Sequence, residues 1–424
     1  MRASSAQARP ATAALLLALT LGLALAACSS SGQPGQARGP AAGTPPASGP
    51  TASPATSAVP ATNWLQYHAN AARTGAVPGL PAAGRLSLAW SRRLDSAVYG
   101  QPLVIGGTVI AATEADEVYG LDLATGAVRW HTRVGRPAAA GEQPCGDISP
   151  LGITSTPVYD PRTRLVYVVA QDGRSGHVMA GLRVPDGHVR VRMMVPSPDH
   201  QPFYDQQRGA LALYGSHIYV AFGGHDGDCG PYRGAVVAMP ASGHGPIWHY
   251  LVPTGREGGI WASGGPVAGP GGTIYISTGN GAVASTRYDG SDSVTALTPA
   301  LRPLGSFAPA DWRTLSAADE AAVSGETVYV PCMTGLAAVD TARDRVRVRW
   351  RGPAGVSGSP VIGGGAVWVA SPDTGVLYEL APRTGRVLAR INLASQLPHF
   401  VSPALSGGLV LVGTMTGVTA LSGG

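Results

Sequence analysis

The 424-residue sequence contains no lysine and few charged residues of any kind. Its thirty basic residues are all arginine, and charged residues make up 13% of the chain, about half of the ~25% typical of globular domains. Helical bundles need charged side chains on their exposed faces, so this shortage argues against them. The arginines are scattered, and the net charge of +5 therefore gives no reason to expect nucleic-acid binding.

Several patterns of enzymes and metalloproteins are absent as well. The sequence has no Cys-x-x-Cys-His haem attachment site, no pair of adjacent cysteines, and no Ser/His/Asp or paired-carboxylate spacing that stands out. We therefore assign no catalytic residue and no metal ligands from these patterns.

Glycine, in contrast, is abundant. The chain contains 59 glycines, about twice the usual ~7% share. Short runs rich in Val, Ile, Tyr and Ala alternate with Asp-Gly and Thr-Gly pairs that suit hairpin turns. Clear examples are Leu165–Val169, His217–Ala221, Thr273–Ser277 and Leu409–Val412. We expect an all-β fold of many short strands.

A repeated sequence pattern predicts the number of structural units. A small residue with proline, a Gly-rich turn and a series of apolar strands first appears at Gln101–Trp130. Similar openings follow at Thr156, Ala210, Gly265, Ala321, Ser359 and Ser402. Repeats of about 40–50 residues with four short strands each are typical of β-propellers. We predict about seven four-stranded blades, with eight as the alternative.

The last repeat stops one strand short, at Thr419–Leu421. Leu86–Leu94 lies before the first blade and carries Trp90, like the tryptophan that closes other repeats. If this N-terminal strand completes the last blade, the ring closes and no sheet edge is left open to wrong pairing. We predict this closure.

The N-terminus has the features of an export signal. Arg2 and Arg9 precede an apolar run, Ala11–Ala27, that ends in small residues. Leu25–Cys28 resembles the lipobox of bacterial lipoproteins, which implies that the Cys28 thiol is lipidated and becomes the new N-terminus. An ordinary signal peptide with a chance cysteine is the alternative.

The segment after Cys28 has the composition of a flexible tether. Residues 29–61 are almost entirely Ser, Gly, Pro, Ala and Thr, too poor in large apolar groups to fold. We therefore divide the chain into a lipoprotein signal peptide (1–28), a disordered tether (29–61) and a propeller domain (62–424). We expect an exported monomer, lipid-anchored to the outer face of the cell membrane.

Two cysteines lie in loops of the predicted propeller. Cys145 belongs to the connection from the first blade to the second, and Cys229 to the long hairpin loop of the third. Such connections and loops open on the same face of a propeller, and disulfides persist in exported proteins. We expect a disulfide between them; two buried free thiols or a bound metal are the alternatives. Cys332 follows a strand and is expected to be a small buried residue.

Two motifs resemble those of the PQQ-like propeller superfamily. Trp64–Gly75 resembles its opening sequence, and Gly120–Trp130 is similar to its blade-closing motif, whose tryptophan stacks between neighbouring blades. The resemblance covers residues 62–424. It extends to lipid-anchored members, to the outer-membrane assembly lipoprotein of Gram-negative bacteria and, more distantly, to quinoprotein alcohol dehydrogenases. It implies the fold and leaves the function open, because non-enzymatic members carry the motif too.

The quinoprotein dehydrogenases bind pyrroloquinoline quinone (PQQ) and calcium above the ring centre. Thr278–Gly281 resembles their Thr-Gly-Asn stretch, whose asparagine is a calcium ligand. The resemblance makes Asn280 a candidate cofactor-binding residue, with Asp292 in the same loop. Cys229 stands where the dehydrogenases have a ligand glutamate, and calcium needs 6–8 oxygen ligands. The alternative is that Asn280 simply forms a turn.

The long loops carry many polar residues that would gather on one face. They are Asp147, His225, Asp226, Asp228, Asn280, Arg287, Asp289 and Asp292. A ligand or metal pocket and ordinary solvated loops are both compatible with them. Arginines alternate with other residues over 343–351, which predicts the solvent face of an outer strand or, alternatively, a patch for anionic lipid or wall polymer.

These observations favour a non-catalytic binding or scaffold protein at the cell envelope. Its partners would be the membrane, through the lipid anchor, and an envelope protein or polymer on the loop face. No cofactor is assigned. The alternative is a PQQ- and calcium-dependent dehydrogenase of the quinoprotein type.

Overall fold

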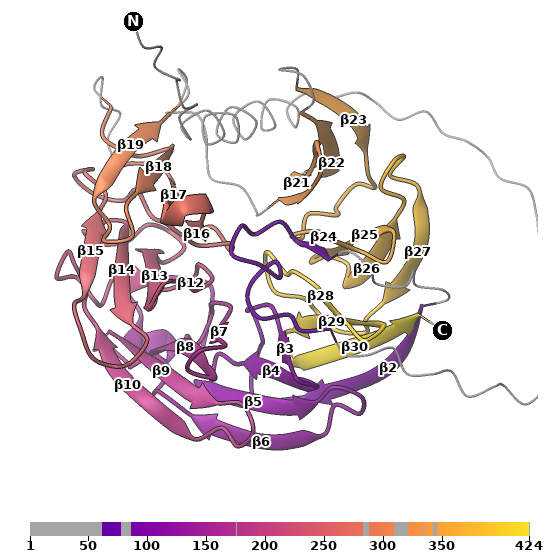
Figure 1. The fold of residues 1–424 in the computed structure, drawn as a ribbon, viewed down its shortest axis with the longest axis horizontal. Coiled ribbons are helices and arrows are strands. Elements are labelled where there is room, and N and C mark those ends of the chain that lie inside the picture. Colours follow the sequence, from indigo (N-terminus) through magenta and orange to yellow (C-terminus); the bar gives the residue numbers. More distant parts are fainter. Residues whose placement is uncertain are drawn as a thin grey trace, which may run out of the picture.

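The computed structural model describes residues 62–77, 86–174, 176–282, 288–308, 321–332, 334–341 and 346–423. Seven antiparallel sheets surround a common centre (Figure 1). The fold is therefore a seven-bladed β-propeller, and both the predicted all-β class and the blade count are confirmed. The predicted signal peptide with Cys28 and the tether lie outside the described residues.

Each blade is a four-stranded sheet numbered here from the ring centre outward. Blade 1 contains β3 (Leu103–Ile105), β4 (Thr108–Ala112), β5 (Glu117–Asp122) and β6 (Val128–Arg133). Blade 2 contains β7 (Val158–Asp160), β8 (Leu165–Gln171), β9 (His177–Arg183) and β10 (Val189–Val195). Blade 3 contains β12 (Ala212–Tyr214), β13 (His217–Gly224), β14 (Ala235–Pro240) and β15 (Trp248–Leu251), with β11 (Asp205–Gln206) paired to the end of β13.

The second half of the ring repeats this order. Blade 4 contains β16 (Val267–Ala268), β17 (Ile274–Thr278), β18 (Ser293–Leu297) and β19 (Pro303–Phe307). Blade 5 contains β20 (Ala322–Ser324), β21 (Thr327–Cys332), β22 (Gly335–Asp340) and β23 (Arg347–Arg351). Blade 6 contains β24 (Val361–Gly363), β25 (Ala366–Ser371), β26 (Val376–Leu380) and β27 (Val387–Asn392).

Blade 7 joins the two ends of the domain. Its inner strands are β28 (Ala404–Ser406), β29 (Leu409–Thr414) and β30 (Gly417–Gly423), and its outer strand is β2 (Leu86–Arg93). The antiparallel register runs from Leu86 opposite Gly423 to Arg93 opposite Gly417. The predicted closure by the N-terminal strand is confirmed.

Helices are scarce in the described part of the chain. It contains two single-turn 3-10 helices, Ala140–Glu142 and Pro270–Gly272. No helix there is long and apolar enough to cross a membrane.

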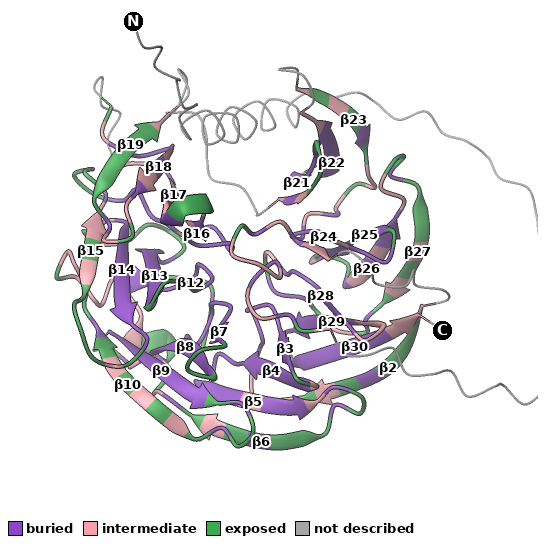
Figure 2. Cartoon of the chain, in the orientation of Figure 1, coloured by how far each residue is buried: buried purple, intermediate pink, exposed green. Residues whose placement is uncertain are grey.

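Burial follows the distance of a strand from the ring centre (Figure 2). All five residues of β4 are buried, because an inner strand packs against neighbouring blades on both faces. The outer strand β10 alternates between exposed and half-buried residues until its buried last position. Arg347, Arg349 and Arg351 are exposed on outer strand β23, as predicted; Arg343 and Arg345 lie outside the described residues.

Outer-strand tryptophans join neighbouring blades. The indole of Trp130 in β6 packs on the turn of blade 2, where its Nε1 donates a hydrogen bond to the Val184 carbonyl at 2.7 Å. Gly187 in that turn has a φ of +70°, and a Cβ at this position would collide with the indole. The same arrangement joins Trp90 of blade 7 to Gly126 of blade 1, and Trp350 of blade 5 to Gly385 of blade 6. The stacking that the family resemblance implied is therefore present.

Residues 64–77, here called the N-terminal plug, cross the centre of the ring as the indigo segment of Figure 1. The main chain of Trp64 pairs with Val104 of blade 1. The carbonyl of Leu65 accepts a hydrogen bond from the Tyr159 amide of blade 2. At its far end, β1 (Ala76–Val77) pairs in parallel with β24 of blade 6. The plug thus adds hydrogen bonds to inner strands on opposite sides of the ring.

Candidate functional site

The loop face of the ring carries a disulfide that ties two distant loops together. Cys145, between β6 and β7, is bonded to Cys229, between β13 and β14, with their Cα atoms 6.2 Å apart. The predicted bond is therefore confirmed. It pins the blade 1–2 connection to the long loop of blade 3. Cys332 is buried at the end of β21, as expected.

Asn280 and Asp292 lie on opposite sides of the β17–β18 loop of blade 4. The Asp292 amide donates a hydrogen bond to the Gly279 carbonyl at 2.8 Å, which brings the two candidate residues together at the base of the loop. Asn280 is exposed, and its Nδ2 donates to Glu257 Oε2 at 3.2 Å. Between described residues, no hydrogen bond or ion pair links this pair directly to Cys145 or Cys229. Arg287, in the same loop, lies outside the described residues.

Side chains from opposite connections meet over the ring axis. Arg208 precedes β12 of blade 3, whereas His399 and Phe400 lie between β27 of blade 6 and β28 of blade 7. The Arg208 guanidinium donates to the His399 carbonyl at 3.1 Å and stacks 5.1 Å from the Phe400 ring centre. Because these connections belong to opposite sides of the ring, their contact spans its axis.

An aromatic ring from a third connection completes this group. Trp261, between β15 and β16, lies with its ring centre 6.2 Å from that of Phe400. We call Arg208, Phe400 and Trp261 the axial stack. Asp147 reaches the same region, with Oδ2 3.5 Å from His399 Nε2. Side chains of the protein itself therefore meet over the ring axis on the loop face.

A match to a protein-family model agrees with the propeller fold described above. Residues 82–293 match the family model described as outer membrane protein assembly factor BamB, a model of PQQ-like repeats. The chain belongs to this family. No curated protein sequence matches the chain.

Solved structures with the same fold include quinoprotein enzymes. Quinohemoprotein alcohol dehydrogenase from Comamonas testosteroni is 14% identical with a TM-score of 0.64, over 85% of this chain and 80% of that chain. The related enzyme ADHIIG from Pseudomonas putida HK5 is 15% identical with a TM-score of 0.61, over 85% and 80%. A europium-containing methanol dehydrogenase is 14% identical with a TM-score of 0.64, over 85% and 98%. At these identities the likeness establishes the fold alone.

The family's PQQ-like fold raises the question of whether Asn280 belongs to a calcium site. Glu257, its partner, is buried and ion-paired to Arg256 at 2.6 Å. The Cys229 sulfur is used in the disulfide with Cys145 and is not free to act as a ligand. Among the described residues no three His, Cys, Asp or Glu side chains are placed to hold a metal ion. The donor set therefore does not fit a calcium ion, which needs 6–8 oxygen ligands, and we derive no PQQ chemistry from it.

Three carboxyl groups of the ring, those of Glu114, Asp116 and Asp205, are buried. Glu114, in the β4–β5 loop of blade 1, accepts hydrogen bonds at Oε2 from the Gly152 amide at 2.7 Å and the Thr154 hydroxyl at 3.1 Å. Burial raises its pKa to about 7. Burial, together with the charge of Glu114, raises the pKa of Asp116 to about 9. Asp205 has its pKa raised to about 8, mainly by burial.

These shifts predict that the domain is more stable in mild acid than in mild base. The folded protein holds protons on these carboxyls that the unfolded chain has already lost, so stability falls as pH rises from about 4 to about 9. Each group contributes up to about 1.4 kcal/mol per pH unit within its own window. Thermal unfolding should therefore give a higher Tm at pH 5.5 than at pH 8.5.

Asp116→Asn tests the cause of this dependence. The variant should flatten the Tm profile between pH 5.5 and 8.5, because the amide cannot ionise. Asp226→Asn, at an exposed loop position, is the matched control and should leave the profile as in the wild type. A wild-type Tm that rises over this range would contradict the prediction.

The axial stack was not predicted from the sequence. Arg208 and His399 are 191 residues apart, and neither lies in a repeat motif. Glu257, the partner of Asn280, was missed too. The only sequence signal was positional, since Arg208, Glu257 and His399 all lie in connections between blades.

Proposed function

We propose that this protein is an extracytoplasmic, lipid-anchored propeller that binds a partner of the cell envelope without transforming it. The observation that carries the proposal is the axial stack. In the quinoprotein dehydrogenases the cofactor lies above the ring centre, whereas here Arg208 and Phe400 meet across that position. A ring centre crossed by contacts between the protein's own side chains suits a scaffold better than a substrate chamber.

The family supports a binding role. Its model is named for an outer membrane protein assembly factor, which favours contacts with other envelope proteins. The Cys145–Cys229 bond limits the movement of two loops of this face, which helps them to present a fixed binding surface.

The proposed location follows from the N-terminal sequence. The apolar run before Cys28 and the Ser/Gly/Pro/Ala/Thr-rich residues 29–61 suit a lipid anchor with a flexible tether. We propose that the propeller is held in this way at the outer face of the cell membrane, as a monomer.

Cell fractionation tests the anchor. The wild-type protein should sediment with membranes, whereas Cys28→Ala should appear in the medium, because the thiol that carries the lipid is gone. Ser29→Ala keeps the thiol and should fractionate as the wild type. Unchanged membrane retention of Cys28→Ala would contradict the anchor.

The released Cys28→Ala protein also tests the absence of catalysis. Titration calorimetry with PQQ and calcium chloride should give no binding heat, because the donors around Asn280 do not form a calcium site. PQQ-dependent oxidation of primary alcohols by this protein would overturn the scaffold proposal and favour the dehydrogenase alternative.

A further inference from the structure

The contact between blades 3 and 4 departs from the tryptophan docking seen elsewhere in the ring. Trp248 in β15 pairs with Ala238, the same register that Trp350 has with Ala338. Its indole, however, is only half-buried and stacks on His217 of its own blade, 4.2 Å between ring centres. Its Nε1 donates no hydrogen bond to any residue that the structure describes.

The turn of blade 4 explains this difference. In the docked pairs a glycine with positive φ receives the tryptophan; in blade 4 the corresponding position is Leu301, with a φ of +58°. The Leu301 side chain is buried, 2% exposed. Because a leucine side chain fills the space that glycine leaves open, Trp248 cannot pack on this turn as Trp130 packs on Gly187.

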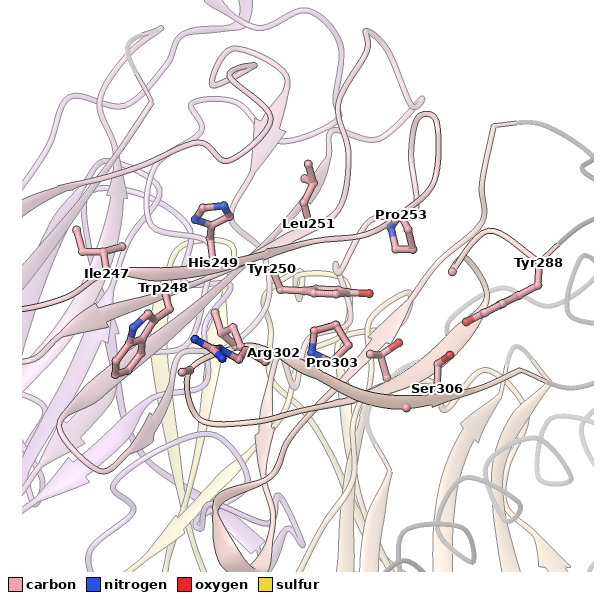
Figure 3. A pocket seen from close by; sticks show the side chains of 15 residues that line it. Ile247, Trp248, His249, Tyr250, Leu251, Pro253, Tyr288, Arg302, Pro303 and Ser306 are labelled. Carbon is pink, nitrogen blue, oxygen red and sulfur yellow. The ribbon is translucent and has the colours of Figure 1, made fainter.

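The result is a groove of 760 Å³ between β15 and β19 (Figure 3). Its volume is within the ~300–1,000 Å³ typical of ligand sites. Tyr250 of β15 and Thr295 of β18 both line the groove, which therefore lies between the faces of two blades.

Aromatic rings dominate the groove. Trp248 and Tyr250 lie two residues apart on the same face of β15, which places them about 7 Å apart along the strand. Tyr288, 40% exposed, points toward Tyr250 from the opposite end of the groove (Figure 3). Flat apolar faces at this spacing match the apolar faces of successive sugar rings better than they match a compact ligand.

The polar groups of the groove are donors and hydroxyls. Arg302 is exposed, and its guanidinium makes no hydrogen bond or ion pair with a described residue. Ser306 and the Trp248 Nε1 add further hydrogen-bonding positions, and none of the described residues that line the groove carries a carboxylate. β15 and β19 also lack the arginines that mark β10 and β23. The walls therefore suit a hydroxyl-rich, uncharged or weakly acidic ligand.

We propose that the groove between blades 3 and 4 binds a saccharide chain. Sugar rings stack on Trp248 and Tyr250, while Arg302 donates hydrogen bonds to their hydroxyl or acidic groups. This deepens the proposed function by naming a polysaccharide of the cell envelope as ligand. The groove can nevertheless be tested separately from the anchor, because it lies wholly within the propeller.

Titration calorimetry on the Cys28→Ala protein tests the groove with two probes, chitohexaose and the acidic hyaluronan hexasaccharide. We expect at least one to bind with a Kd on the order of 0.1–1 mM. Trp248→Ala and Tyr250→Ala should each weaken binding about tenfold, and Arg302→Gln should mainly weaken binding of the acidic probe. Leu88→Ala removes an apolar side chain, 60% exposed on β2, and should leave binding unchanged.

A blocking variant keeps the test valid if an alanine variant unfolds. Gly305 faces the groove from β19, and a Cβ there meets no atom within 4 Å. Gly305→Phe should therefore fold with the wild-type Tm and abolish binding. Failure of both probes to bind, binding that persists in Gly305→Phe, or binding of a proline-rich peptide in place of either saccharide would overturn the proposal. If the Cys28→Ala protein with an intact groove binds neither saccharide, while the wild-type protein still sediments with membranes, the groove proposal fails and the anchor proposal stands.

Discussion

Replacing Arg73 by methionine is expected to lower the free energy of unfolding by about 3–5 kcal/mol. Arg73 is 2% exposed at the centre of the ring. Its guanidinium donates to the carbonyls of Tyr67 at 3.0 Å, Leu211 at 2.8 Å and Pro266 at 3.4 Å. Methionine keeps the apolar part of the side chain but leaves three buried carbonyls without this donor, and a buried unsatisfied group costs about 1–3 kcal/mol.

The loss should be large because these carbonyls belong to the plug, to the start of blade 3 and to the start of blade 4. Denaturant unfolding followed by circular dichroism measures it. Arg92→Met is the matched control: Arg92 Nε also donates to a carbonyl, that of Gly126 at 2.7 Å, but the side chain is only half-buried. Equal midpoints for the two variants would show that the plug does not depend on Arg73.

Trp130→Ala is expected to cost a similar amount, about 3–5 kcal/mol, because a large buried aromatic leaves a cavity that its neighbours cannot fill. Trp130 is 9% exposed, and it also loses its bond to the Val184 carbonyl of the next blade. The glycine beneath it, Gly187, has no side chain that could move into the space. The cavity therefore separates blade 1 from blade 2.

Trp248→Ala provides the comparison within the same fold. Its indole is half-buried and packs on its own blade, so we expect a loss of only about 1 kcal/mol. Thermal and denaturant unfolding of both variants measures the difference. If the two substitutions cost the same, contact across the blade boundary is not what makes the docked tryptophans stabilising.

The repeat pattern made the architecture predictable. Each blade opening recurs in the sequence, and the missing last strand together with Trp90 predicted how the ring closes. The Cys145–Cys229 bond was predictable for a related reason: the topology of a propeller alone places both loops on one face. In each case the prediction used a feature that every blade shares.

The candidate sites depend on departures from the repeat, and these were not predictable. The groove arises because Leu301 stands where other blades have a turn glycine. The sequence alone does not show that Trp248 faces this position, so the consequence of the leucine could not be predicted. The axial stack needs Arg208 and Phe400 from opposite sides of the ring. Asn280 matched a family motif. Whether it can help to bind a metal ion depends on Glu257 and Cys229, and only the three-dimensional structure shows which partners these two residues have.

The pairing of β2 with β30 also fixes the order in which the domain can be completed. β2 leaves the ribosome early, but its partner ends at Gly423, so blade 7 cannot form until almost the whole domain has emerged. The plug must likewise wait for β24 of blade 6. Contacts of such long sequence separation form slowly. Until then β2 remains without its partner strand, so the earliest strand of the ring is among the last to be paired.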